Sequence, residues 1–281
     1  MNNHIIIIGN EKGGAGKTTC AMHIIASLLD QGAKVASMDV DSRQLSLTRY
    51  IENRKKTIAK TNIPLPLSTH YIVPFSTQDN IKDIEAEEAR NFNEILDKVK
   101  VENDFIVIDT PGSNSFLSRH AHSYADTIVT PINDSFVDVD LLAKISVNNS
   151  TTGNFDIERP SIYSQMVWEQ KIARAKRDNG SIDWVVMRNR LSPMDARNKR
   201  NVSDVLEKLA KRVGYRLSAG FSERVIFREL FIHGLTLLDL NKKIPNIPLA
   251  MTHIAARQEL RELIKVLNLQ DKFKAKELIE S

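Results

Sequence analysis

The beginning of the chain shows an apolar run followed by a helical pattern. Residues 4–8 read HIIII and end at a Gly-Asn pair, which predicts a buried strand. After a glycine-rich stretch, apolar residues recur at helical spacing until Gly32, where a C-terminal cap belongs. The pattern therefore predicts a strand, a loop and a helix in direct succession.

The same alternation continues along the chain. Further apolar runs predict strands in residues 33–40, 104–112, 126–133 and 181–189. Helical patterns lie between them, in residues 80–100, 115–124, 136–147, 162–178 and 195–213. Because the strands are apolar throughout, we expect an α/β fold with a mostly parallel, twisted sheet flanked by helices on both faces. Ligands of such sheets bind beyond the carboxyl ends of the strands.

We expect residues 1–281 to form a single domain with two appendages. Residues 54–78 contain three prolines and show no periodicity, which is typical of a surface insertion. Residues 255–281 favour a C-terminal helical tail. Its ten charges between Glu259 and Glu280 are evenly divided in sign, so it does not resemble a membrane anchor, whose polar face is basic.

Composition limits the class of protein. A single cysteine, Cys20, excludes a disulfide framework and a paired-cysteine metal site. The sequence contains neither a signal-peptide pattern nor an apolar run that could span a membrane. These observations predict a cytoplasmic protein without stable membrane insertion.

Charge is spread unevenly. The net charge is +4, but residues 171–228 hold fifteen Lys/Arg and six Asp/Glu, a local charge of +9. The remainder of the chain is therefore near −5. A basic segment on an acidic protein indicates a polyanionic partner, unless the charges form a solvated helix face.

The strongest motif is KGGAGKTT, which lies between the first strand and the first helix. Glycines in such a loop let backbone N–H groups surround phosphate oxygens at the positive end of a helix. Lys17 is placed to neutralise the β- and γ-phosphates, and Thr18 to hold Mg²⁺ through its hydroxyl. The predicted nucleotide-binding residues are Lys12, Gly13, Gly14, Ala15, Gly16, Lys17, Thr18 and Thr19. The expected ligands are ATP and Mg²⁺.

One departure from the usual P-loop pattern is informative. The position of the first glycine is occupied by Glu11, and an additional lysine, Lys12, follows it. The loop thereby resembles the deviant Walker-A ATPases of the ParA/MinD type, with the signature KGGxGK[ST]. The resemblance implies a P-loop NTPase fold and an ATP-dependent homodimer in which Lys12 reaches the phosphates of the other subunit.

Polar residues at other predicted strand ends fit the same family. By motif position the resemblance assigns water activation to Asp41, supported by Asp39, and both follow the second strand. Asp109 matches a Walker-B aspartate that acts on Mg²⁺. Asn189, at the end of the strand predicted in residues 181–189, is a candidate for reading the base, or a structural turn residue.

Three longer stretches of the sequence point to one group within the ParA/MinD type. The runs MDVDSRQLSLTRYIENR, RNRLSPMDARNKRNV and ERVIFRELFIHGLTLLDL resemble the MipZ division-plane positioning ATPases over about residues 3–268. The resemblance implies a slow regulatory ATPase that binds DNA non-specifically on the nucleoid, interacts with a ParB-like protein and inhibits FtsZ assembly. Two alternatives stay open: a ParA-type partition ATPase and an ATP-dependent ligase or amidase on the same fold.

The basic segment independently suggests DNA contacts. The candidates are Arg197, Lys199, Arg200, Arg224 and Arg228. Contacts of such side chains with phosphates alone give sequence-independent, salt-sensitive binding. Arg224 and Arg228 are four residues apart, a spacing that places two side chains on one helical face.

Overall fold

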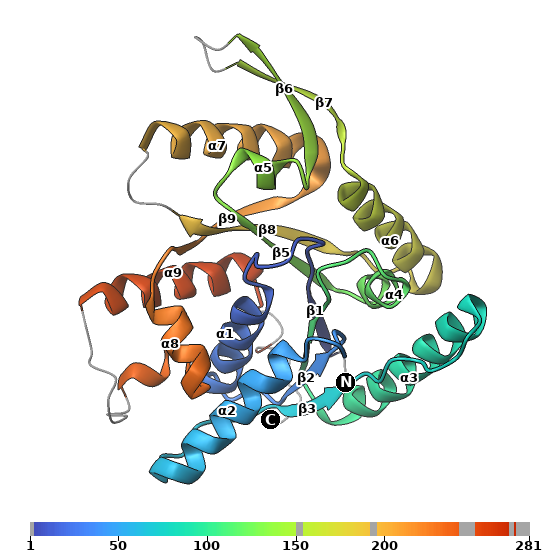
Figure 1. Ribbon diagram of the computed structural model, residues 1–281, viewed down its shortest axis with the longest axis vertical. Helices are drawn as coiled ribbons and strands as arrows, with labels where there is room; N and C mark the ends of the chain where they lie inside the picture. The colour runs from blue at the N-terminus through green and yellow to red at the C-terminus, as the bar shows by residue number, and fades with distance from the viewer. Residues whose placement is uncertain (1–2, 150–153, 192–195, 242–250, 270–272, 274–281) are drawn as a thin grey trace.

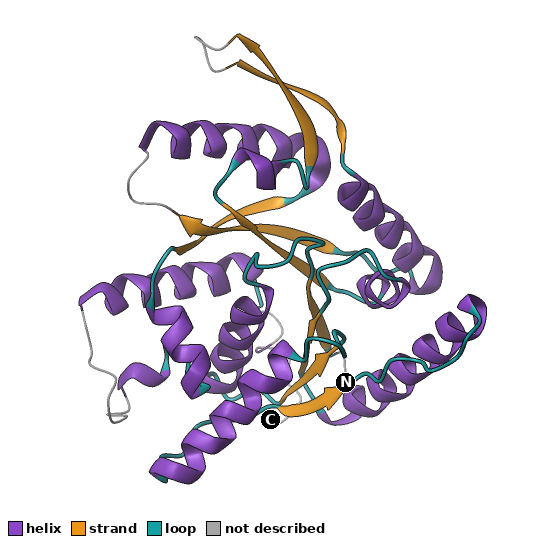
Figure 2. Ribbon diagram, viewed as in Figure 1, coloured by secondary structure: helices purple, strands orange, loops and turns teal. Residues whose placement is uncertain are grey.

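A computed structural model describes the chain except residues 1–2, 150–153, 192–195, 242–250, 270–272 and 274–281. Its centre is a seven-stranded sheet in which every paired strand runs parallel to its neighbour (Figures 1 and 2). The strand order is β3-β2-β4-β1-β5-β8-β9. These strands are β1 His4–Ile8, β2 Val35–Asp39, β3 Thr69–Ile72, β4 Phe105–Asp109, β5 Thr127–Asn133, β8 Asp183–Leu191 and β9 Arg216–Ser222. The predicted α/β fold is confirmed.

Helices cover both faces of this sheet (Figure 1). One face is covered by α1 Lys17–Asp30, α2 Ser46–Thr61, α8 Ile226–His233 and α9 Met251–Leu267. The other face is covered by α3 Ile81–Glu102, α4 Phe116–Ser123, α5 Phe136–Val139, α6 Ile162–Asp178 and α7 Ala196–Leu209. None of the described helices is long and apolar enough to cross a membrane.

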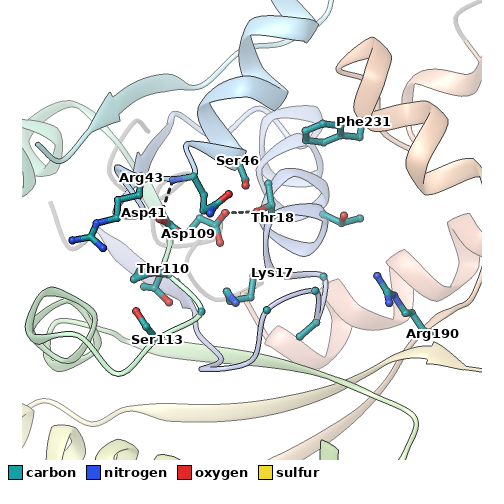
Figure 3. A pocket seen from close by; sticks show the side chains of 18 residues that line it. Lys17, Thr18, Asp41, Arg43, Ser46, Asp109, Thr110, Ser113, Arg190 and Phe231 are labelled. Atoms are coloured by element: carbon teal, nitrogen blue, oxygen red, sulfur yellow. Dashed lines mark hydrogen bonds between the residues drawn. The ribbon is translucent and has the colours of Figure 1, made fainter. Parts of the chain in front are cut away.

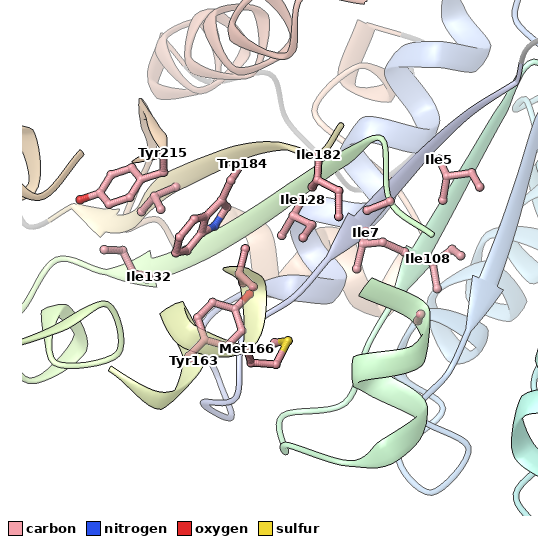
Figure 4. Close-up of a cluster of buried hydrophobic side chains, with 14 of the residues drawn as sticks. Ile5, Ile7, Ile108, Ile128, Ile132, Tyr163, Met166, Ile182, Trp184 and Tyr215 are labelled. Carbon is pink, nitrogen blue, oxygen red and sulfur yellow. The ribbon is translucent and has the colours of Figure 1, made fainter. Parts of the chain in front are cut away.

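The sheet divides the interior into two hydrophobic cores. Strand β1 supplies both, because Ile5 and Ile7 point into one core and Ile6 and Ile8 into the other. Figure 4 shows the first of these cores, where Ile7 lies in one cluster with Ile108 on β4. Burial on both faces explains why β1 and β4 carry apolar residues at consecutive rather than at alternate positions. It also holds β1 firmly, directly before the glycine-rich loop.

The predicted surface insertion in residues 54–78 is wrong. Helix α2 continues to Thr61, and β3 pairs with β2 at the edge of the main sheet. Arg54 is fully buried and forms an ion pair with Asp239, at 2.6 Å. The segment lacks a sequence pattern because its contacts are long-range, and the half-exposed strand β3 is short.

The predicted helix in residues 136–147 is also wrong beyond its first turn. After α5 the chain forms strand β6 Ala143–Asn149, which pairs antiparallel with β7 Asn154–Pro160. This hairpin extends away from the main sheet (Figure 2). The run AKISVNN alternates apolar and polar residues, which favours a strand over a helix.

Other predicted boundaries agree to within a few residues, and α6 matches its predicted range. Helix α7 ends at Leu209 and is followed by a π-helical turn, Ala210–Gly214. In the predicted tail, α9 reaches Leu267, while most of residues 270–281 lies outside the described part of the chain.

Candidate nucleotide-binding site

The glycine-rich loop joins β1 to α1 and is shaped by two left-handed residues. Gly14 has φ 73° and Gly16 has φ 91°, conformations that glycine adopts without strain. Gly16 is the N-cap of α1, so the loop delivers backbone N–H groups to the positive end of the helix. Lys17 Nζ donates a hydrogen bond to the carbonyl of Lys12, at 3.1 Å, which folds the lysine over the loop.

A cavity of about 610 Å³ opens in front of this loop (Figure 3). The segments after β2 and β4 also line it, so three neighbouring strands end on it, and β8 and α8 each contribute a residue. The lining includes Lys17, Thr18, Asp41, Arg43, Asp109, Thr110, Ser113, Arg190 and Phe231. The predicted position of the site, beyond the carboxyl ends of the strands, is thus where the structure places the cavity.

Thr18 and Asp109 form the part of the cavity that suits a divalent cation. The Thr18 hydroxyl donates to Asp109 Oδ2 at 2.6 Å, and the figure draws this bond (Figure 3). Asp109 Oδ1 is buried and accepts no hydrogen bond from the described residues. Burial raises the pKa of Asp109 to about 7, against a smaller opposing effect of the Thr18 hydrogen bond. A buried carboxylate oxygen without a partner, next to a hydroxyl, matches the oxygen ligands that Mg²⁺ prefers.

Lys17 is the central positive charge of the cavity. Burial lowers its pKa, and the carboxylates of Asp109 and Asp41 oppose that effect. A side chain added at Gly112 would approach Lys17 Nζ to 3.3 Å and the Gly13 nitrogen to 3.2 Å. The loop after β4 therefore closes tightly on the glycine-rich loop, and only a residue without a side chain leaves this space open.

The two aspartates after β2 occupy different environments. Asp41 lines the cavity and accepts the Gln44 N–H with Oδ1 at 3.1 Å. Asp39 is fully buried and accepts hydrogen bonds from the N–H and the hydroxyl of Thr48, both at 2.9 Å. Thr48 lies in the first turn of α2, so Asp39 satisfies the beginning of that helix and does not line the cavity.

Lys12 lies on the rim of the loop and is held by an ion pair. Its Nζ is 2.8 Å from Asp138 Oδ1, with 40% of the Lys12 side chain exposed and 6% of the Asp138 side chain. Asp138 is on α5, and the Ser135 hydroxyl donates to its other oxygen at 2.7 Å. The outer side of the loop is open, since a side chain added at Gly13 or Gly14 would meet nothing within 4 Å.

Asn189 contacts the loop itself. Its Nδ2 donates to the carbonyl of Ala15 at 2.8 Å, and a side chain added at Gly16 would collide with it. Next to it a second cavity of about 510 Å³ continues from the first toward α8. It is lined by Gly16, Thr19, Asn189, Arg190, Arg224, Phe227, Arg228 and Phe231, among others. Aromatic and polar side chains beside the loop suit a nucleotide base.

The basic candidates for DNA contact that the structure describes have different surroundings. Arg224 forms a two-bond ion pair with Glu259 of α9, with one bond of 2.9 Å, so it is not a free cation. Arg228 is exposed but lines the second cavity, and Arg200 is exposed on α7. The side chains of Arg197 and Lys199 lie outside the described part of the structure, although both belong to α7.

Sequence reasoning missed several residues of the site: Asp138, Gly112, Arg190 and Phe231. One signal could have found Asp138. The run Ser135-Phe-Val-Asp138 after β5 is a capping-box pattern, and the structure shows Ser135 capping α5. The ion pair with Lys12 joins residues 126 positions apart, which no local pattern reveals.

Comparison with protein families decides the affiliation, since the profile described as "ATPase MipZ" matches residues 4–271. The chain belongs to the MipZ family of ATPases. Among curated relatives, it is 26% identical over 159 residues to the chromosome partitioning protein ParA of Myxococcus xanthus, covering 50% of this chain and 56% of ParA. It is 30% identical over 157 residues to the septum site-determining protein MinD of Helicobacter pylori, covering 50% and 58%. The matched regions thus span little more than half the length of these relatives.

Solved structures agree with the MipZ assignment at the level of the fold. The cell division ATPase MinD of Pyrococcus furiosus has a TM-score of 0.56 at 19% identity, covering 94% of this chain and 100% of that one. Apo McdA of Cyanothece has a TM-score of 0.58 at 19% identity, covering 92% and 100%. MinD of Pyrococcus horikoshii, solved with Mg-ADP, has a TM-score of 0.56 at 18% identity, covering 95% and 98%.

Proposed function

We propose that this MipZ-family chain is a slow regulatory ATPase whose ATP-bound form is a homodimer. The position of Lys12 carries the proposal. It is a second lysine of the phosphate loop, yet its ammonium lies on the rim beside Asp138 and not over the cavity that Lys17 serves. Gly13 and Gly14 leave the outer face of the loop open for a second subunit.

Each residue of the cavity then has a chemical task. Lys17 neutralises the β- and γ-phosphates, and the backbone N–H groups of the loop hold phosphate oxygens. Mg²⁺, when bound to Thr18 and Asp109, supplies the charge that stabilises the departing phosphates. Asp41 positions the attacking water, and Lys12 of the partner subunit adds positive charge from the opposite side. Bound ATP thereby contacts both subunits, and its hydrolysis weakens the dimer.

We further propose that the dimer binds chromosomal DNA non-specifically, interacts with a ParB-like protein, and positions the division plane by inhibiting FtsZ assembly in the cytoplasm near the nucleoid. Exposed Arg200 on α7, with its neighbours Arg197 and Lys199, supports the DNA contact. Two copies of such a patch bind DNA more strongly than one, which couples DNA affinity to ATP.

DNA binding with ATP, a non-hydrolysable analogue or ADP, across a salt series, tests the proposal. We expect binding only in the triphosphate states and a steep decrease of affinity with salt. Equal binding by the ADP-bound monomer would refute the dimer switch.

Two of the curated relatives favour a second candidate, a ParA-type partition ATPase. FtsZ polymerisation separates the two, since a MipZ-type function predicts that the ATP-bound dimer shortens FtsZ polymers and a partition function does not. A ligase or amidase on this fold would hydrolyse ATP only with a small-molecule acceptor.

A further inference from the structure

A continuous set of hydrogen bonds runs from Ser68, the residue before the edge strand β3, through His70 on β3 to Asp39 at the end of β2. Ser68 Oγ lies 2.8 Å from Ser37 Oγ, and Ser37 Oγ lies 2.9 Å from His70 Nδ1. On the other side of the ring, His70 Nε2 lies 2.9 Å from Thr48 Oγ1. Four of the five members of this set, Ser68, Ser37, Thr48 and Asp39, are buried, and His70 is partly buried.

The donor and the acceptor in each hydrogen bond of this set follow from the carboxylate of Asp39, at which the set ends. Asp39 accepts three donors, namely the N–H and hydroxyl of Thr48 and the N–H of Asp41, the last at 3.1 Å. Burial raises the pKa of Asp39, and these three hydrogen bonds oppose that effect because they favour the ionised carboxylate. Because the single Thr48 hydroxyl hydrogen is donated to Asp39, Thr48 Oγ1 must accept a hydrogen bond from the N–H at His70 Nε2.

The remaining protons are then fixed. Burial lowers the pKa of His70 to about 4, with a smaller effect of Lys55, so the ring is neutral at physiological pH. A neutral imidazole with a proton on Nε2 accepts at Nδ1. Ser37 therefore donates to His70 and accepts from Ser68. The bonds all point one way, from Ser68 through Ser37, His70 and Thr48 to Asp39.

The end of this set governs the conformation of the Asp41 segment. Asp39 Oδ1 holds the Asp41 N–H, Asp39 Oδ2 holds the first turn of α2, and the Asp39 carbonyl accepts the Val73 N–H at the end of β3, at 3.0 Å. The short chain between Asp39 and Thr48 contains Asp41 and Arg43, both of which line the cavity. Fixing both ends of this segment places the Asp41 carboxylate.

We propose that His70 is a positioning residue for ATP hydrolysis, which acts through Thr48 and Asp39 on the location of Asp41. This inference rests on the proposed hydrolytic role of Asp41. The proposal assigns a function to β3, because the imidazole of His70 on this strand orients the hydrogen bonds at the beginning of α2.

His70→Leu tests the proposal, since leucine fills similar space without a hydrogen bond. We expect kcat for ATP hydrolysis to fall on the order of 10-fold while the dissociation constant for ATP stays within about 2-fold. His70→Gln, whose amide can both donate and accept, should recover most of kcat. Ile72→Ala is the matched control, because Ile72 lies on the same strand, is 41% exposed and has no place in the hydrogen-bonded set.

A second pair of variants separates this inference from the proposed function. In an Asp41→Ala background, His70→Leu should lower the residual rate no further, because both changes act on one group. Full hydrolysis by Asp41→Ala would overturn the role of Asp41 and the inference together. Loss of hydrolysis in Asp41→Ala with wild-type kcat in His70→Leu would overturn the inference alone, as would an equal loss in Ile72→Ala.

Nitrogen NMR of the wild-type protein gives an independent readout that does not depend on how the variants fold. We expect the His70 ring to carry its proton on Nε2 and none on Nδ1. A proton on Nδ1 in the nucleotide-free protein would contradict the direction of the hydrogen bonds and overturn the proposal.

Discussion

The contact between Lys12 and Asp138 gives a sharp test of the dimer mechanism. In the single chain, Asp138 binds the ammonium of Lys12, the lysine that is proposed to reach the phosphates of the partner subunit. Dimer formation must therefore break the pair once in each subunit. Asp138→Asn removes the negative charge but keeps an oxygen that can accept the Ser135 hydroxyl, which caps α5. We expect this variant to dimerise more strongly than wild type.

The magnitude follows from the exposure of the pair. Lys12 is 40% exposed at its side chain, so water screens the attraction although Asp138 is nearly buried. A partly exposed ion pair is worth about 1 kcal/mol. Two such pairs break per dimer, which amounts to about 2 kcal/mol, or roughly a 30-fold lower dissociation constant of the dimer.

Sedimentation or light scattering with a non-hydrolysable ATP analogue measures this constant over a dilution series. Asp140→Asn is the matched control, because Asp140 lies at the end of the same helix, is exposed and is not the ion-pair partner of Lys12. An unchanged or weaker dimer in Asp138→Asn would refute the reasoning. It would mean that Asp138 holds Lys12 in the orientation that the dimer uses.

Three further variants test other parts of the site and its support. Lys12→Ala should bind ATP normally and remain monomeric in light scattering, and a normal dimer would exclude a cross-subunit role. Burial raises the pKa of Asp109 to about 7 from 3.8. Its contribution to stability is thus complete below pH 3.8 and lost as pH rises through 7. Unfolding free energy of nucleotide-free, Mg²⁺-free protein should then decrease by at most about 1.4 kcal/mol per pH unit in this range, and Asp109→Asn should flatten the dependence seen by urea denaturation. Asp239→Asn leaves the Arg54 charge buried and unpaired, so urea denaturation should show a loss of about 3–5 kcal/mol, against almost none for exposed Asp30→Asn.

The central sheet was predictable because its innermost strands, β1 and β4, are runs of consecutive apolar residues. Strand β4 is an example, since the run FIVID is buried at every position and ends on Asp109. The cavity followed from the same reasoning, because parallel strands end on one edge. Local patterns thus suffice for a strand such as β4, which is apolar up to the polar residue at its carboxyl end.

Residues 54–78 could not be predicted because their partners are remote in sequence. Arg54 pairs with Asp239, which lies 185 residues away, and His70 contacts Ser37, 33 residues earlier. The sequence alone does not show whether an arginine is buried or exposed to solvent. The sequence likewise does not tell which basic residues in 171–228 are free. Arg174, Arg188, Arg216 and Arg224 are in ion pairs with acidic residues.

The hairpin formed by β6 and β7 has a mechanical consequence. It begins directly after α5, which carries Asp138, and ends at α6, where the Ser161 N–H donates to the Leu142 carbonyl at 3.1 Å. Each strand has seven residues and therefore extends about 23 Å. A rotation of about 10° at this base moves the far ends of the strands by about 4 Å. A rotation of α5 that accompanied the release of Lys12 would therefore move the far ends of β6 and β7 much further than α5 itself.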